Sequence, residues 1–158
     1  MATAVEPVIS GVTSEQSSVQ TGTKRIRTVV VDDSETFLQV VCALLELDPQ
    51  MDVVARADKG GEAIETVMKL QPDLILMDVH MPYLDGLTLA WFFGWRFPSA
   101  RVVLMSTEST PELRTACEDS GAMDFIHKEN FRDEFRAALE RMSGEEWQGT
   151  VLSAVFSS

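Results

Sequence analysis

Short apolar runs alternate along the chain with longer segments of helical periodicity. The apolar runs show no clean polar alternation, as expected of strands that are buried on both faces of a parallel sheet. They span residues 26–31, 51–55, 74–77, 102–105 and 123–126. Apolar residues recur at helical spacing over residues 34–47, 61–70, 86–97, 111–120 and 131–142. Strand followed by helix, five times, predicts an α/β doubly wound domain.

Proline and glycine support these boundaries. Pro49, Pro72 and Pro98 follow the first three helical segments, and proline cannot continue a helix because it lacks the backbone donor. Thr110 is a suitable N-cap ahead of a helix that begins with proline, and Gly121 suits a left-handed C-terminal cap.

Composition indicates one domain with two tails. The chain has 158 residues, 45% of them hydrophobic, which is enough for one full core. We predict a domain over residues 25–142, a disordered N-terminal tail over 1–24 that is rich in Ser, Thr, Val and Gly, and a C-terminal tail over 143–158. No secretory signal pattern and no run of 18 apolar residues occurs, so we expect a soluble, cytoplasmic chain without a membrane partner.

Charge and the metal-binding residue types exclude several classes of site. The net charge of -12 argues against a nucleic-acid surface, which needs a basic patch. Cys42 and Cys117 lack CxxC spacing, so we predict buried structural thiols with no disulfide and no zinc. His80 and His127 are far apart in sequence and make a poor metal set.

Five polar residues follow the apolar runs and should meet at one edge of the sheet. They are Asp32, Asp33, Asp78, Ser106 and Lys128. Taken singly, each has an ordinary structural role, as a helix cap, a turn residue or a surface lysine. The carboxyl ends of parallel strands gather on one edge, however, and three carboxylates there would repel one another unless a cation shares the site. Hard oxygen ligands suit Mg²⁺, and a hydroxyl with an ammonium group suits a phosphoryl group.

The sequence around these residues resembles the receiver domain of bacterial response regulators. The matching motifs read Val-Val-Val-Asp-Asp-Ser at 29–34, Asp-Leu-Ile-Leu-Met-Asp at 73–78, Met-Pro-Tyr-Leu-Asp-Gly at 81–86, Met-Ser at 105–106 and Gly-Ala-Met-Asp-Phe-Ile-His-Lys at 121–128. Residues 45–55 are most similar to receivers that carry a C-terminal helix-turn-helix. The resemblance implies a (βα)5 flavodoxin-like fold with a central five-stranded parallel sheet. It also implies a signalling protein of a two-component system that is not an enzyme.

The resemblance assigns a role to each acid. Asp78 would be the phosphoacceptor, taking a phosphoryl group from a phosphohistidine on a sensor histidine kinase or a phosphotransfer protein. Asp33 and Asp78 would bind Mg²⁺ directly, Asp32 would act through a metal-bound water, and the backbone carbonyl of His80 would complete the protein ligands.

Three further residues would neutralise charge and report the modification. Lys128 would pair with the phosphoryl oxygens, and Ser106 would hydrogen-bond one of them. Phe125 would then turn inward and change the surface that partners bind. The alternative is a purely structural role, in which Phe125 is a fixed core aromatic.

The sequence departs from the family pattern in three places. Glu129 stands after the lysine where receivers usually have a cis proline, so we expect a trans peptide and an altered loop that bears on the reach of Lys128. Thr107 stands where a small alanine is common, and residues 143–158 are too few for a helix-turn-helix. These departures leave open a receiver-like module that acts by binding or dimerisation without phosphorylation. A phosphatase with an aspartyl intermediate would need a second acid at position 80, where histidine stands.

The helix over residues 86–97 carries an unusual number of aromatic residues. Leu89, Ala90, Phe93 and Phe97 share one face and are the predicted core stripe, which directs Trp91, Trp95, Leu87 and Phe92 away from it. Soluble monomers rarely expose such a patch. We therefore predict that Trp91 and Trp95 form a protein contact, with a second copy of the chain or with another protein. The alternatives are a rotated helix, or a tail that folds over the rings.

Overall fold

A computed structural model describes residues 24–143, and the predicted tails lie outside these residues apart from Lys24 and Ser143. The elements in chain order are β1 (Ile26–Val31), α2 (Glu35–Glu46), β2 (Met51–Ala57), α3 (Gly60–Leu70), β3 (Leu74–Asp78), α4 (Gly86–Arg96), β4 (Arg101–Ser106), α5 (Pro111–Asp119), β5 (Asp124–His127), a 3₁₀ turn η2 (Lys128–Asn130) and α6 (Phe131–Ser143). The strands form one parallel sheet in the order β2-β1-β3-β4-β5. This order is that of the flavodoxin-like fold and confirms the predicted fold class.

The helices begin and end where local chemistry predicts. Thr110 caps α5 through its side chain, which accepts a hydrogen bond from the N–H of Leu113, and Ser34 caps α2 in the same way. Gly121 follows α5 with φ +90, the left-handed conformation predicted for it. The largest boundary difference is in β2, which runs two residues past the predicted end because Ala57 still pairs with Val31 of β1.

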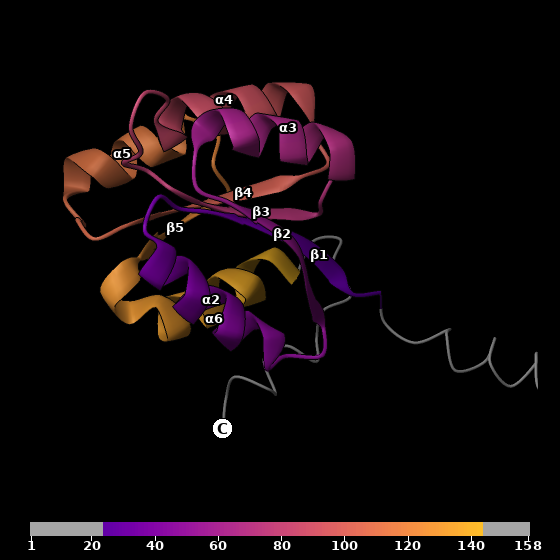
Figure 1. The fold of residues 1–158 in the computed structure, drawn as a ribbon. Coiled ribbons are helices and arrows are strands. Elements are labelled where there is room, and N and C mark those ends of the chain that lie inside the picture. The colour runs from indigo at the N-terminus through magenta and orange to yellow at the C-terminus, as the bar shows by residue number, and fades with distance from the viewer. Residues whose placement is uncertain (1–23, 144–158) are drawn as a thin grey trace, which may run out of the picture.

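Both faces of the sheet are covered by helices (Figure 1). The helices α3, α4 and α5 lie on one face, and α2 and α6 lie on the other. Successive residues of β1 point to opposite faces of the sheet. Val30 packs in the hydrophobic cluster with α2 and α6, while Val29 and Val31 pack in the hydrophobic cluster on the other face. The apolar runs therefore lack alternation because both faces of each central strand are buried. No helix within residues 24–143 is long and apolar enough to cross a membrane.

Candidate functional site

Three carboxylates lie together at the edge of the sheet where the strands end. Each of Asp32, Asp33 and Asp78 offers a carboxylate oxygen that lies within 4.8 Å of the others. Asp32 and Asp78 are buried, and Asp33 is exposed. The N–H of Ser34 donates to Asp32 Oδ1 at 2.9 Å, which fixes that carboxylate. The predicted grouping of the three acids is what the fold produces.

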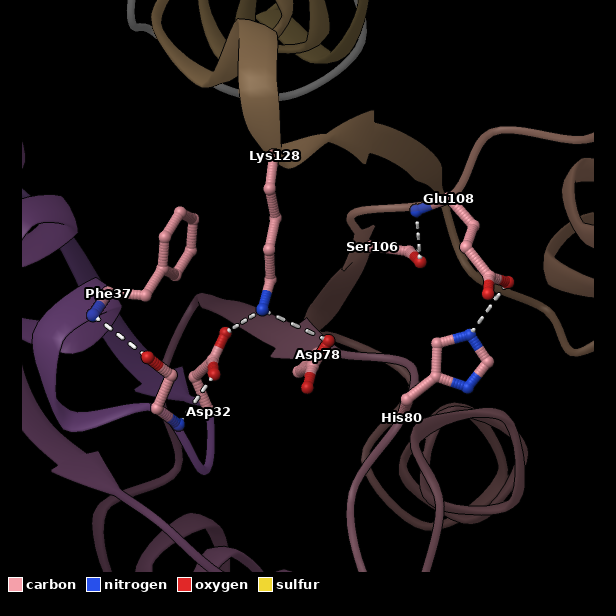
Figure 2. Close-up of polar contacts among 8 residues, drawn as sticks. Asp32, Phe37, Asp78, His80, Ser106, Glu108 and Lys128 are labelled. Carbon is pink, nitrogen blue, oxygen red and sulfur yellow. Dashed lines mark hydrogen bonds and ion pairs between the residues drawn. The ribbon is translucent and has the colours of Figure 1, made fainter.

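Lys128 enters the same cluster from the end of β5 (Figure 2). Its Nζ lies 2.6 Å from Asp32 Oδ2 and 3.2 Å from Asp78 Oδ1, and its side chain is only 10% exposed. No peptide bond within residues 24–143 is cis, which confirms the trans geometry expected before Glu129. The altered loop is the 3₁₀ turn η2, and Lys128 reaches both acids from it. Loss of the proline therefore does not remove the lysine from the site.

The electrostatics of the cluster favour a cation. Burial first, and the charge of Asp32 second, raise the pKa of Asp78 to about 6. Lys128 lowers this pKa, and Asp33 raises it slightly. One ammonium group therefore leaves negative charge in excess. The donors are hard oxygens, as Mg²⁺ prefers, so the residues present fit that ion.

A glycine lets the start of α4 approach the end of β3 closely. The N–H of Gly86 donates to the carbonyl of Val79 at 2.8 Å. A Cβ at Gly86 would lie 2.2 Å from the carbonyl oxygen of Asp78 and 2.9 Å from the Cα of Val79. Any side chain there would push against backbone, so this glycine sets how tightly the loop wraps around Asp78.

Ser106 lies at the end of β4, next to a polar pair that sequence reasoning missed. Its buried Oγ accepts the N–H of Glu108 at 2.9 Å. The carboxylate of Glu108 lies 3.4 Å from Nε2 of His80, and both side chains are exposed (Figure 2). The imidazole of His80 thus points to Glu108, while the predicted metal ligand is its backbone carbonyl, which stays a prediction.

Phe125 is buried, with its ring under a cation. The guanidinium of Arg114 lies 4.7 Å from the ring centroid, and Arg114 also donates to Ser109 Oγ at 2.8 Å from Nη2. Arg114 therefore links the ring to the loop that follows Ser106. The buried ring fits both a switch and a fixed core aromatic, so the switch stays a prediction.

Two other residues at the site were not singled out from the sequence. The ring of Phe37 lies beside the Lys128 side chain, and Glu108 lies beside His80. Phe37 is on the first turn of the helix after Asp33, and this closeness to the acids is the only sign in the sequence that it could belong to the site. Its apolar side chain by itself predicts core packing.

The tryptophans of α4 are exposed, as predicted. Trp91 is 62% exposed and Trp95 is 70% exposed, while the predicted core stripe of Leu89, Ala90, Phe93 and Phe97 is buried. The rotated-helix alternative is therefore wrong. Leu87 and Phe92 differ from the prediction because they are half-buried and pack against the core at the flanks of the helix. The alternative in which a tail covers the rings concerns residues outside those described.

Comparison with known proteins places this arrangement in a family. The family model described as the response regulator receiver domain matches residues 28–140. A protein-glutamate methylesterase/protein-glutamine glutaminase of Geobacter sulfurreducens is 36% identical over 88% of this chain and 38% of its own length. The receiver domain of the response regulator NarL from Mycobacterium tuberculosis is 30% identical with a TM-score of 0.71, over 78% of this chain and 99% of that one. The receiver domain of CheB from Thermotoga maritima is 29% identical with a TM-score of 0.65, over 85% and 98% of the two chains.

These comparisons correct one prediction. We expected a protein that is not an enzyme, whereas curated relatives, including one from Photobacterium profundum at 35% identity, are named methylesterases and glutaminases, which are enzymes. The chain spans about a third of the length of those two relatives, 32% and 38%. Receiver domains generally bind Mg²⁺ at an acidic pocket and take phosphoryl groups from histidine kinases or phosphotransfer proteins. The model match and the shared fold show that this chain belongs to the response regulator receiver domain family.

Proposed function

We propose that Asp78 is the phosphoacceptor of this receiver. The observation that carries the proposal is the placement of Asp78 Oδ1 3.2 Å from the Lys128 ammonium, inside a cluster of three acids. A carboxylate oxygen of Asp78 forms a bond to phosphorus while the bond from phosphorus to the donor's nitrogen or oxygen breaks. The leaving group departs with the bonding electrons. Lys128 then neutralises charge on the phosphoryl oxygens, so the protein acts mainly by positioning.

Mg²⁺ fits the same site and would be held by Asp33 and Asp78, with Asp32 acting through water and the carbonyl of His80 as a further ligand. When bound, the ion supplies neutralisation of charge on the phosphoryl group. Lys128 and Ser34 keep Asp32 oriented toward the cluster, because each contacts one of its two carboxylate oxygens.

We propose that Ser106 and Phe125 transmit the modification to the surface. The hydroxyl of Ser106 exchanges its contact with the Glu108 N–H for one with the phosphoryl group, and the loop that carries Arg114's partner Ser109 shifts with it. Ser106→Ala should still accept phosphate at Asp78 but lose the phosphorylation-dependent change in partner affinity. An unchanged response in that variant would favour a fixed core aromatic at Phe125.

The phosphoacceptor is tested by intact mass. The chain is incubated with Mg²⁺ and acetyl phosphate, and the expected result is the mass of one added phosphoryl group, absent from Asp78→Asn and absent when Mg²⁺ is chelated. Ser106→Ala serves as a folded control that still gains mass. A phosphoryl group that persists in Asp78→Asn places the acceptor elsewhere. No modification of the wild type would favour the phosphorylation-independent binding module.

The names of the sequence relatives favour one kind of activity for this receiver to control. Because the sequence relatives are named methylesterases, we propose that this receiver regulates a protein-glutamate methylesterase. The donor is then a sensor histidine kinase or a phosphotransfer protein. The test is the rate at which a protein-glutamate methylesterase under the control of this receiver hydrolyses methyl esters, with and without a phosphodonor. Equal rates in the two conditions would exclude this output.

A further inference from the structure

The ammonium group of Lys128 has a third neighbour besides its two carboxylates. Its Nζ lies 4.5 Å from the centroid of the Phe37 ring, a distance at which a cation is attracted to the ring face. Figure 2 shows the Phe37 ring, from α2, beside the lysine side chain on the side away from Asp78. The ammonium is thus enclosed by an aromatic ring and two acids, and the lysine side chain is only 10% exposed. Desolvation of this kind strengthens a cation–ring contact.

The ring itself is held from two directions. On α2, the N–H of Phe37 donates to Ser34 Oγ at 3.2 Å, which fixes the first turn of the helix. The ring makes a T-shaped contact with Phe131, with a centroid distance of 6.2 Å and an interplanar angle of 89°. Phe131 in turn stacks on Phe135, with centroids 5.2 Å apart. Phe37 cannot move without disturbing the aromatic packing at the start of α6.

Phe37 and Lys128 are also connected through the backbone, because the aromatic residue that supports the Phe37 ring follows Lys128 closely in sequence. Phe131 begins α6 directly after η2, the turn that Lys128 opens, and the N–H of Phe131 donates to the Lys128 carbonyl. The segment that carries the lysine therefore also carries the residue that supports its aromatic neighbour. In a chain where Glu129 replaces the usual proline, these contacts restrict the flexible lysine stem.

We propose that Phe37 is a positioning residue for Lys128: its ring holds the ammonium group beside Asp78 and thereby sets the rate of phosphoryl transfer. The rate claim rests on the proposed role of Asp78 as phosphoacceptor. The ring touches the ammonium and neither the phosphoryl group nor the carboxylates in this role. It is the contact that stays in place while Lys128 exchanges an oxygen of Asp78 for a phosphoryl oxygen.

The variants separate the ring face from its bulk. Phe37→Leu keeps an apolar side chain against the core but removes the face, and Phe37→Tyr keeps the face. The matched control is Phe92→Leu on α4, where a half-buried phenylalanine packs against the other core cluster, far from the lysine in sequence and on the opposite face of the sheet. Thermal unfolding of each variant establishes that it is folded, and Phe37→Met replaces Phe37→Leu if the latter is not.

The first readout is the rate of modification by acetyl phosphate with Mg²⁺. Phe37→Leu should be slower by about five- to tenfold, which corresponds to about 1 to 1.4 kcal/mol for a partly desolvated cation–ring contact. Phe37→Tyr and Phe92→Leu should stay within about twofold of the wild type. A wild-type rate in Phe37→Leu overturns the proposal.

The second readout reports the lysine directly and needs no phosphorylation. Protons over a ring face are shielded, so the ε-methylene signal of Lys128 should lie upfield in the wild type and in Phe37→Tyr, and move downfield in Phe37→Leu. The chain has four lysines, at 24, 59, 69 and 128, and Lys128→Arg assigns the signal. A slow Phe37→Leu with an unmoved lysine signal would mean that the ring acts through general packing, which overturns positioning. If the wild type is not modified at all, the proposed function and the rate claim fail together, while the lysine signal still decides whether the ring places Lys128.

Discussion

The fold buries the Asp78 carboxylate beside two other carboxylates. Burial and charge repulsion make its ionised form unfavourable, which has a measurable consequence for stability. Its pKa rises from 3.8 to about 6 through burial first and the charge of Asp32 second. The folded chain therefore keeps the proton to higher pH than the unfolded chain does. The resulting stabilisation is fully present below about pH 3.8 and is lost as pH rises through about 6.

Replacing this carboxylate should stabilise the metal-free protein at alkaline pH. Asp78→Asn removes the buried charge, so we expect the free energy of unfolding at pH 8 to rise by up to about 3 kcal/mol, and the difference to shrink toward zero as pH falls to about 4. Urea unfolding in the presence of a chelator measures both values. Glu65→Gln, at an exposed acid on α3, should show no such dependence. A destabilised Asp78→Asn at pH 8 would contradict this account.

At the scale of one element, α4 contains two glycines with opposite expected behaviour. Gly86 lies against the backbone of Asp78, whereas a Cβ at Gly94 would meet nothing within 4 Å. Gly86→Ala should therefore lower the free energy of unfolding by about 1–3 kcal/mol through overpacking. Gly94→Ala should raise the free energy of unfolding by about 0.5–1 kcal/mol, because alanine lowers the backbone entropy of the unfolded chain. Chemical denaturation of the two variants measures both changes in the free energy of unfolding. A destabilising Gly94→Ala would contradict the open space that the structure shows beside Gly94.

The exposed face of α4 also tests the predicted protein contact. Trp91 and Trp95 lie one helical turn apart, and each tryptophan can bury about 150–250 Å². If a second copy of the chain covers them, sedimentation should show a dimer, and Trp91→Glu with Trp95→Glu should weaken it about tenfold or more without lowering the unfolding temperature. Met68→Glu, at an exposed methionine on α3, is the control. A wild type that stays monomeric, or a dimer that the double variant leaves unchanged, would remove the self-contact.

For the whole molecule, the site joins elements that are distant in sequence, so a bound cation should stabilise the entire domain. Asp32 and Asp33 follow β1, Asp78 ends β3, and the lysine follows β5. At a Mg²⁺ concentration about 100 times its Kd, the added stability is about 2.7 kcal/mol. We expect the unfolding temperature to rise by several degrees at pH 8 with Mg²⁺, and the effect to weaken as pH falls through about 6, where protons compete for Asp78.

Thermal unfolding across Mg²⁺ concentration and pH measures this dependence. Ser106→Ala should keep the response to Mg²⁺, and Asp33→Asn should lose most of it. A rise in unfolding temperature that is the same in Asp33→Asn as in the wild type would indicate that the ion binds outside the acidic cluster.

The order of elements and the edge that holds the site followed from the sequence by itself. Parallel strands that are buried on both faces are mostly apolar, so β3, the second half of β1 and the middle of β4 are visible as apolar runs. Residues that end such strands must meet at one edge, which grouped Asp32, Asp78 and Lys128 before any contact was known. Caps such as Thr110 and Gly121 were readable because they depend only on local backbone geometry.

Tertiary structure decided what depends on packing between elements that are distant in sequence. The ring of Phe37 reaches Lys128 only because α2 and α6 pack side by side on one face, and a half-buried phenylalanine in a helical pattern looks like any core residue. The pKa of Asp78 is likewise a property of the assembled cluster, since burial and the neighbouring charge of Asp32 arise only when β1 and β3 pair. The reach of Lys128 without a proline was also settled in three dimensions, because a trans 3₁₀ turn can deliver the ammonium group to the same acids.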